Sequence, residues 1–185
     1  MSSKIGDWQK ALRTINEKNL KFALGTAYAN AAVAAGLMLK KAIQKGIKSQ
    51  GASFGQRFKP LHPFTIERKG SAKALIDKGD LFNSVTYVLV SRHDVFVGVP
   101  RTASGKGGNI VNIAAILETG TSINLRKNPQ VRKYLTGAGM KLKSDTKVVT
   151  IPPRPFVKPA VDKEMPAVLA MFKQTTSNAI KTLMK

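Results

Sequence analysis

The sequence predicts a single α+β domain over residues 1–185, in which a long N-terminal helix and a C-terminal helix flank a small antiparallel sheet. Apolar residues recur at three- and four-residue steps near both chain ends, and a region rich in valine and threonine lies between them. The hydrophobic fraction of 43% is enough for a core, but aromatic residues make up only 6%. We therefore expect a modest core and some stabilisation by neighbouring subunits.

The N-terminal region, residues 1–50, is predicted to be helical from Asp7 to Ser49. Its apolar periodicity begins at Trp8, and no proline interrupts it. The polar stretch Asn16–Asn19 could divide it into two helices. The apolar run Phe22–Leu39 is the only candidate for a membrane span, but its polar residues and many alanines disfavour that reading, so no membrane contact is expected.

Two basic loops are expected, Gly51–Gly70 and Thr121–Lys147. Glycines and prolines should prevent regular structure in the first, whereas Asn128–Leu135 can form a helical turn inside the second. Apolar side chains alternate with cations in the first loop: Phe54, Phe58, Leu61 and Phe64. Such residues can stack on nucleic-acid bases, but we favour the interpretation that they pin the loop to its own domain.

The clearest β region is Leu81–Val99, which predicts an antiparallel hairpin with a turn at Arg92–Asp94. A glycine- and serine-rich tip follows over Pro100–Asn109. A short apolar helix over Ile110–Leu117 then ends at Gly120.

The last part of the chain, from Val148 onward, should return to regular structure. Val148–Ile151 is predicted to be a strand, and the prolines that follow it should hold the chain extended. Pro159–Lys185 should form the C-terminal helix, packed on the sheet. Pro166 is tolerable if this helix begins near Asp162 and would kink it if it begins at Pro159.

Four short motifs occur in a fixed order: Leu75–Val85 (LIDKGDLFNSV), Val95–Val99 (VFVGV), Ile113–Thr121 (IAAILETGT) and Ile151–Ala160 (IPPRPFVKPA). Together they resemble the phage tail-completion and head–tail joining proteins. The chain is similar to the family named for gene product ten of phage HK97 and to the virion-morphogenesis proteins of Mu-like phages. The resemblance covers roughly residues 75–185, and each motif alone is weak. Lys78, where the family usually has threonine, and the long basic stretch Ser122–Val149 depart from it.

The motif residues also have physical interpretations. Gly79 permits a sharp turn, and Ser84 can bond to the backbone of that turn. Glu118 lies near a helix end, where it opposes the dipole, so we expect a cationic partner and favour Arg154. Phe156, between prolines, should be a rigid buried anchor. The predicted structural residues are Gly79, Leu81, Ser84, Glu118, Gly120, Arg154, Pro155 and Phe156.

The net charge of +21, from 31 basic and 10 acidic residues, predicts attraction to polyanions. The bland alternative is a solvated surface that keeps the protein soluble. The basic loops over Gln56–Lys73 and Arg126–Lys147 are candidates for facing DNA or an acidic partner ring. The candidate contacts are Arg57, Lys59, Arg68, Lys69, Arg126, Lys127, Arg132, Lys133, Lys141 and Lys143.

Catalysis is disfavoured by the composition of the chain. There is no cysteine, and the two histidines, His62 and His93, both lie in predicted loops. Asp77 and Asp80 form the only close acidic pair, and in a turn they would bond to backbone amides. The tip Ser104–Gly108 lacks the spacing of a phosphate-binding loop. We expect no catalytic residue, no metal and no cofactor, although acids brought together by folding would leave a hydrolase or nuclease open.

The resemblance implies a non-catalytic virion protein. Copies would form a homo-oligomeric ring, with a hexamer favoured and a dodecamer possible, at the neck or tail top of a tailed bacteriophage. Its partners would be connector or stopper and tail-tube proteins, with DNA passing through the centre, after synthesis in the host cytoplasm. The main alternative is a free, non-specific nucleic-acid-binding protein. Ring size and the choice between tail terminator and connector adaptor stay open.

Overall fold

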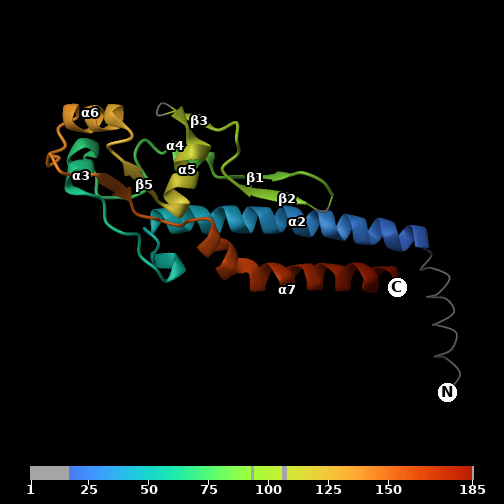
Figure 1. Cartoon of the computed structure of the whole chain (residues 1–185). Helices are drawn as coiled ribbons and strands as arrows, with labels where there is room; N and C mark the ends of the chain where they lie inside the picture. Colours follow the sequence, from blue (N-terminus) through green and yellow to red (C-terminus); the bar gives the residue numbers. More distant parts are fainter. Residues whose placement is uncertain (1–16, 93, 106–107, 185) are drawn as a thin grey trace, which may run out of the picture. The chain divides into compact units, whose positions relative to one another are not determined.

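The computed structural model describes residues 17–92, 94–105 and 108–184 of the chain (Figure 1). These residues form two compact units, each of which combines segments that are distant in the sequence. The helical unit contains residues 17–42, 87–97 and 161–184 as far as they are described, and the mixed unit contains residues 43–86 and 98–160.

The predicted α+β class is confirmed, with a long N-terminal and a long C-terminal helix. The described helices are α2 (Glu17–Lys48), the 3-10 turn η1 (Ala52–Phe54), α3 (Pro63–Lys69), α4 (Asp80–Ser84), α5 (Ile110–Thr119), α6 (Pro129–Gly137) and α7 (Lys158–Leu183). The described strands are β1 (Thr86–Leu89), β2 (Val95–Gly98), β3 (Ser104–Gly105), β4 (Gly108–Asn109), β5 (Thr121–Asn124) and β6 (Val148–Ile151). They pair in chain order as three separate two-stranded sheets rather than as one sheet.

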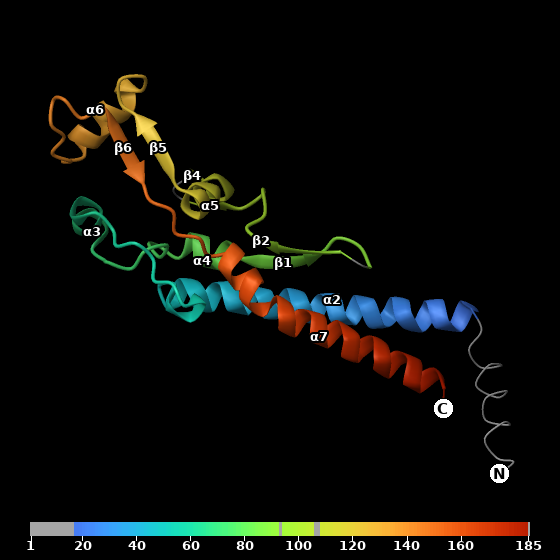
Figure 2. The same cartoon turned by 60° about the horizontal axis from the view of Figure 1, so that its bottom comes forward.

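The helical unit is built on α2 and α7, which run alongside each other in both cartoon views (Figures 1 and 2). Ala35 and Leu39 of α2 form a buried cluster with Val168 of α7, and Val97 of the β1–β2 hairpin packs against it. The small side chains of α2 permit close approach: a Cβ atom at Gly36 would lie 2.8 Å from atoms of both Tyr87 and Val95 in the hairpin. The C-terminal helix thus shares its core with the hairpin and with α2.

Helix α2 is also long and apolar enough to cross a membrane, by length and composition alone. The segment that meets this criterion is Asn19–Lys48, in which an 18-residue window has a mean hydropathy of 1.5. Part of that apolar character is used inside the protein, because Ala31, Ala35 and Leu39 are buried. Packing against α7 therefore accounts for an apolar face on this helix.

The mixed unit begins with the last turns of α2, whose Ile43 and Ile47 are fully buried. Gln50 lies just after α2 with a positive φ of 54°. Its side-chain amide donates to the carbonyl of Ala74 (2.9 Å) and accepts from the N–H of Ala74 (2.5 Å), as a backbone amide would in a sheet. This pair of hydrogen bonds fixes the segment before α4 to the end of α2.

The prediction that regular structure fails over Gly51–Gly70 is wrong, because the segment contains η1 and α3. The proline and glycine that suggested a loop are helix-end residues: Pro63 starts α3, and Gly70 ends it with φ 71°. His62 is the N-cap, and its Nδ1 accepts from the N–H of Phe64 (3.2 Å). The pinning interpretation is confirmed for Phe54, whose ring lies against Gly46 of α2 so closely that a Cβ there would come within 1.6 Å.

The second basic loop is also more regular than expected. Strand β5 was not predicted, and it pairs antiparallel with the predicted β6 from Thr121 opposite Ile151 to Asn124 opposite Val148. Helix α6 confirms the helical turn. Strands β3 and β4 form a short antiparallel pair at the predicted tip.

Two expectations about the long helices can be compared with the structure. Helix α7 begins at Lys158 and continues through Pro166, so this proline is inside the helix. The polar residues at the start of α2 belong to the helix from Glu17 onward. The predicted start at Asp7, with Trp8, and the turn residue His93 lie outside the described residues.

Candidate functional site, a clasp and a basic lobe

The first motif forms the entry to the short helix α4. Gly79 is its N-cap with φ 88°, a left-handed conformation that glycine adopts without strain. Leu81 is buried, and the Ser84 hydroxyl donates to the carbonyl of Asp80 (2.6 Å). The sharp turn predicted at Gly79 and the backbone bond of Ser84 are both confirmed.

Glu118, near the end of α5, binds the N-terminus of α7. One carboxylate oxygen accepts from the N–H groups of Phe156 (2.8 Å) and Val157 (3.1 Å), and the other accepts from the N–H of Lys158 (2.9 Å). The first N–H groups of a helix lack partners within that helix, and a negative charge is favourable there. Glu118 therefore acts as the N-terminal cap of α7.

Arg154 is the only buried charged residue among those described, with a 4% exposed side chain. Its Nε donates to the carbonyl of Lys59 (2.8 Å), its Nη2 to that of Pro60 (2.9 Å) and its Nη1 to that of Pro152 (3.4 Å). Burial lowers the pKa of the Arg154 guanidinium from its ordinary value. The side chain thus fastens the segment before α3 to the segment before α7.

The predicted ion pair between Glu118 and Arg154 is wrong. Each group satisfies its charge with the backbone: the carboxylate binds N–H groups at a helix start, and the guanidinium binds carbonyls of a proline-containing segment. Both residues do have structural roles as predicted: Glu118 is half-buried, Arg154 is buried, and each makes hydrogen bonds. Their partners could not be predicted from the sequence, because every residue has backbone polar groups and only the fold decides which of them meet a given side chain.

We call the segment Pro152–Lys158, held by the side chains of Glu118 and Arg154, the clasp. The N–H of Arg154 donates to the carbonyl of Leu117 (2.7 Å), so the clasp is also bonded to the end of α5 by its backbone. Phe156 is fully buried, and Pro155 before it is half-buried. The predicted anchor role of Phe156 agrees with this burial.

Gly120 directly follows α5 and packs against Pro153 of the clasp, so this position should not tolerate a side chain. Its φ of 73° and ψ of 168° lie in a region that is essentially restricted to glycine. An added Cβ would lie 2.8 Å from the ring and the backbone nitrogen of Pro153. We expect Gly120→Ala to lower the free energy of unfolding by about 2 to 3 kcal/mol, measured by urea denaturation.

Gly137→Ala is the matched control for this prediction. Gly137 lies at the end of α6, and nothing lies within 4 Å of an added Cβ. The control should be neutral or stabilising by up to about 1 kcal/mol, because alanine is the better helix former. Equal effects of the two substitutions would contradict the close packing of the clasp on Gly120.

The basic lobe, which we define as residues 121–151, consists of β5, α6, β6 and their connections (Figure 2). Six of its cationic side chains are exposed: Arg126, Lys127, Lys133, Lys141, Lys143 and Lys147. Five of these were predicted as contacts, and Lys147 was named only as the end of the loop. Two more predicted contacts, Arg57 and Lys59, are exposed in the segment before α3.

Three predicted contact residues instead have structural partners. Arg132 donates to the carbonyls of Lys143 (3.4 Å) and Thr146, which holds the loop after α6 against that helix. Arg68 lies over the ring of Tyr134, 5.5 Å from its centroid, and so joins α3 to α6. Lys69 donates to the carbonyl of Lys73, and desolvation by burial lowers its pKa.

A cavity of about 300 Å³ lies in the mixed unit, between α3, α4 and α5. Its lining is mainly apolar, and its charged residues are Lys69, Asp77, Lys78 and Asp80. Within the described ranges, no group of three or more histidine, cysteine or acidic side chains could hold a metal ion. The predicted pair Asp77 and Asp80 therefore lies at a largely apolar cavity and not in a cluster of acids.

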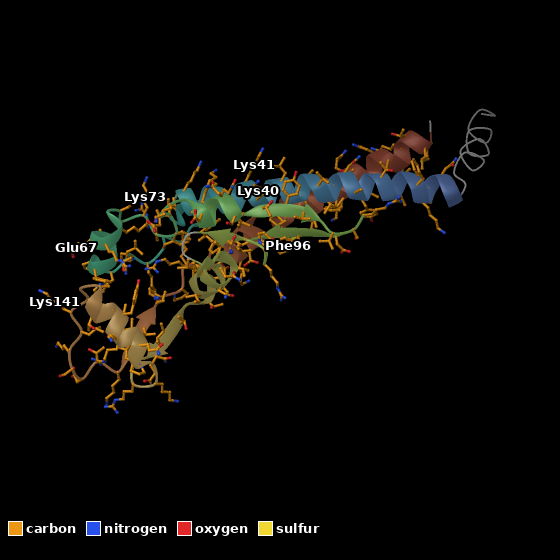
Figure 3. The ribbon with its side chains drawn as sticks, turned by 90° about the horizontal axis from the view of Figure 1, so that it is seen from above. Lys40, Lys41, Glu67, Lys73, Phe96 and Lys141 are labelled. Atoms are coloured by element: carbon orange, nitrogen blue, oxygen red, sulfur yellow. The ribbon has the colours of Figure 1, made fainter. Side chains whose placement is uncertain are left out.

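Large apolar side chains are exposed on the hairpin and on both long helices. On the hairpin, the exposed residues include Val88 of β1, Val90 just after β1, and Phe96 of β2, which Figure 3 labels. On the helices, the exposed residues include Phe22, Tyr28, Val33, Leu37, Leu169, Ile180 and Met184. Tyr28, Leu169, Phe172 and Ile180 line a shallow depression on the helical unit. Much apolar surface thus stays unburied in the single chain.

No family model, no curated protein and no solved structure matches the chain. The clasp, the basic lobe and the exposed apolar surface are therefore the features from which a function can be inferred.

Proposed function

We propose that the chain is a structural, non-catalytic subunit of a tailed-bacteriophage particle, and that its copies form a ring where the tail joins the head. The ring would be a hexamer or a dodecamer that contacts connector or stopper proteins on one side and tail-tube proteins on the other. It would be made in the host cytoplasm and retained in the virion.

The observation that carries this proposal is the clasp. The clasp connects the third and fourth sequence motifs. Glu118 belongs to the third motif, and its carboxylate caps helix α7, which follows the Pro-Arg-Pro-Phe element of the fourth motif. Two of the four motifs whose order resembles that family are thus joined by hydrogen bonds in the structure. This supports a common fold with the head–tail joining proteins, for which the motifs are typical.

The exposed apolar residues support assembly. A monomeric protein rarely keeps extended apolar patches in contact with water, and such patches commonly mark subunit interfaces. Here large apolar side chains are exposed on the β1–β2 hairpin and on both long helices, with exposures of 69% for Val90 and 75% for Phe22. A subunit that completes its burial against neighbours is consistent with a core in which alanine is the commonest buried residue.

Native mass spectrometry and negative-stain imaging of the purified full chain test this proposal. We expect a closed ring of six or twelve copies, formed without any added partner. A compact monomer that persists at high protein concentration would contradict the proposal, since the exposed apolar surface would then have no role in self-assembly.

A free, non-specific nucleic-acid-binding protein is the alternative, favoured by the net charge of +21 and the exposed cations of the basic lobe. The two functions differ in the species that binds. Tight, salt-sensitive binding of DNA by isolated monomers would favour the alternative, because no ring would then be needed.

A further inference from the structure

We infer that the basic lobe binds the phosphate backbone of duplex DNA without reading its sequence. This inference rests on the proposed function for the source of the DNA, which is the duplex that passes through the ring. It assigns the contact to residues 121–151.

The charge of the lobe is strongly one-sided. Residues 121–151 contain seven cations and one acid, Asp145. Six of the seven cations are exposed, and they come from both connections of the lobe as well as from α6. Figure 3 shows Lys141 on the connection after α6, pointing away from the ribbon. A duplex carries negative charge all along its length, so several separate exposed cations can each contact a phosphate.

A folded frame holds these cations in place. Four residue pairs of β5 and β6 form an antiparallel ladder, and the N–H of Leu125 extends it by donating to the carbonyl of Lys147 (2.8 Å). Arg132 binds the carbonyls of Lys143 and Thr146, so it brings the long connection back onto α6. The exposed lysines therefore project from an ordered scaffold, which reduces the conformational entropy lost on binding.

An acidic protein surface is a poorer fit than a phosphate backbone. The centres of protein–protein interfaces are apolar and depleted in lysine. Within the lobe, the structure describes only two exposed large apolar residues, Tyr134 and Val148. The guanidinium of Arg68 already lies over the ring of Tyr134. A surface of separate lysines with few apolar anchors suits phosphate contacts, which need charge but little shape.

The same side chains argue against sequence recognition. Base edges are read mainly by arginine, asparagine and glutamine on an element that fits the major groove. Of the six exposed cations in the lobe, five are lysines and only Arg126 is an arginine. The expected binding is therefore uniform along the duplex, which would let DNA slide past the protein.

A matched pair of variants tests this inference in the full chain. The lobe variant replaces four exposed lysines by glutamine: Lys127, Lys133, Lys141 and Lys143. The control variant replaces four exposed lysines of the long helices: Lys41, Lys45, Lys173 and Lys181. Each variant lowers the net charge of +21 by the same four units, so only the position of the charge differs.

Binding is measured by fluorescence polarisation with a labelled 30-base-pair duplex of random sequence over a range of salt concentrations. For the lobe variant we expect a loss of affinity of roughly tenfold or more at ~0.1 M salt, and a fall of about 3 to 4 in the slope of log Kd against log salt. The control should bind within about threefold of the wild type with an unchanged slope. Similar losses in both variants would overturn the inference, because total charge alone would then explain the binding.

Two further measurements distinguish DNA binding from binding of an acidic protein, and both from ring assembly. Polyglutamate serves as an acidic polypeptide probe, and lobe-dependent binding of polyglutamate but not of the duplex would overturn the inference in favour of an acidic protein. Native mass spectrometry of the same variants reports the ring separately. Rings without lobe-dependent DNA binding would refute the inference alone, whereas lobe-dependent binding by a stable monomer would refute the proposed ring and leave the lobe assignment in place.

Discussion

Replacing Phe156 by alanine is expected to lower the free energy of unfolding by about 4 kcal/mol and to abolish ring assembly. The ring of Phe156 has an exposed fraction of 0%, and its backbone N–H is bonded to Glu118 inside the clasp. Truncation removes the transfer free energy of the ring and leaves a cavity that the prolines around it cannot easily close. Thermal denaturation should show a midpoint about 8 to 16 °C below that of the wild type.

Two companion variants make this result interpretable. Phe22→Ala removes the same side chain from a position that is 75% exposed, so it should change the stability of the unassembled chain by less than about 0.5 kcal/mol. Phe156→Leu keeps most of the buried volume, so it should fold and still form rings with a loss of about 1 to 2 kcal/mol. A soluble Phe156→Ala protein that melts like the wild type would show that the clasp does not depend on this anchor.

Arg154→Ala is expected to be nearly as damaging, with a loss of about 3 to 4 kcal/mol. The substitution removes hydrogen bonds to three carbonyls and leaves those of Lys59 and Pro60 without their donor. Neither proline-rich segment can replace the bonds from its own backbone, since both lack regular structure. Because Lys59 and Pro60 are more than ninety positions from Arg154 in the sequence, the loss should weaken the contact between two segments that are far apart along the chain.

Arg154→Lys discriminates between charge and geometry. The guanidinium reaches the carbonyls of Lys59 and Pro60 with two different nitrogens, Nε and Nη2. An ammonium group keeps the charge but has a single nitrogen, so we expect lysine to recover less than about half of the lost stability in urea denaturation. Arg57→Ala, at an exposed position, should stay within about 0.5 kcal/mol of the wild type. Full recovery by lysine would mean that the three-carbonyl geometry is unimportant.

Periodicity in the sequence predicted the long elements well. The apolar spacing of α2 and α7 and the valine-rich hairpin are strong local signals, and all three elements are present in the described residues. The predicted β region began too early, because Leu81–Ser84 belong to helix α4 and the first strand begins at Thr86. The short elements were harder to predict. Strand β5 has four residues, and only its pairing with β6 makes it a strand. The sequence does not predict α3, because Pro63 and Gly70 can mark either a loop or the two ends of a helix.

The site was predictable in its residues and not in its contacts. Glu118, Arg154 and Phe156 were all singled out from the motifs, and all three belong to the clasp. Charge alone suggested that Glu118 and Arg154 pair with each other, yet both bind backbone groups supplied by folding. For the basic residues, charge could not distinguish the exposed Lys133 from Arg132 beside it, which binds carbonyls of its own lobe.

The way in which α7 is capped has a consequence for how the chain folds. The carboxylate that satisfies its first N–H groups belongs to Glu118, which lies 38 to 40 positions earlier in the sequence. The whole basic lobe lies between these hydrogen-bonded partners along the chain. Helix nucleation is the costly step, and contacts distant in sequence form slowly because a long loop must close first. Helix α7, which leaves the ribosome after α5 and the basic lobe, therefore gains its starting turn only after α5 has formed and the intervening residues have been brought together. Synthesis and folding order are thereby linked, and a nascent chain cut short within the lobe would leave the carboxylate of Glu118 without the helix start that it caps.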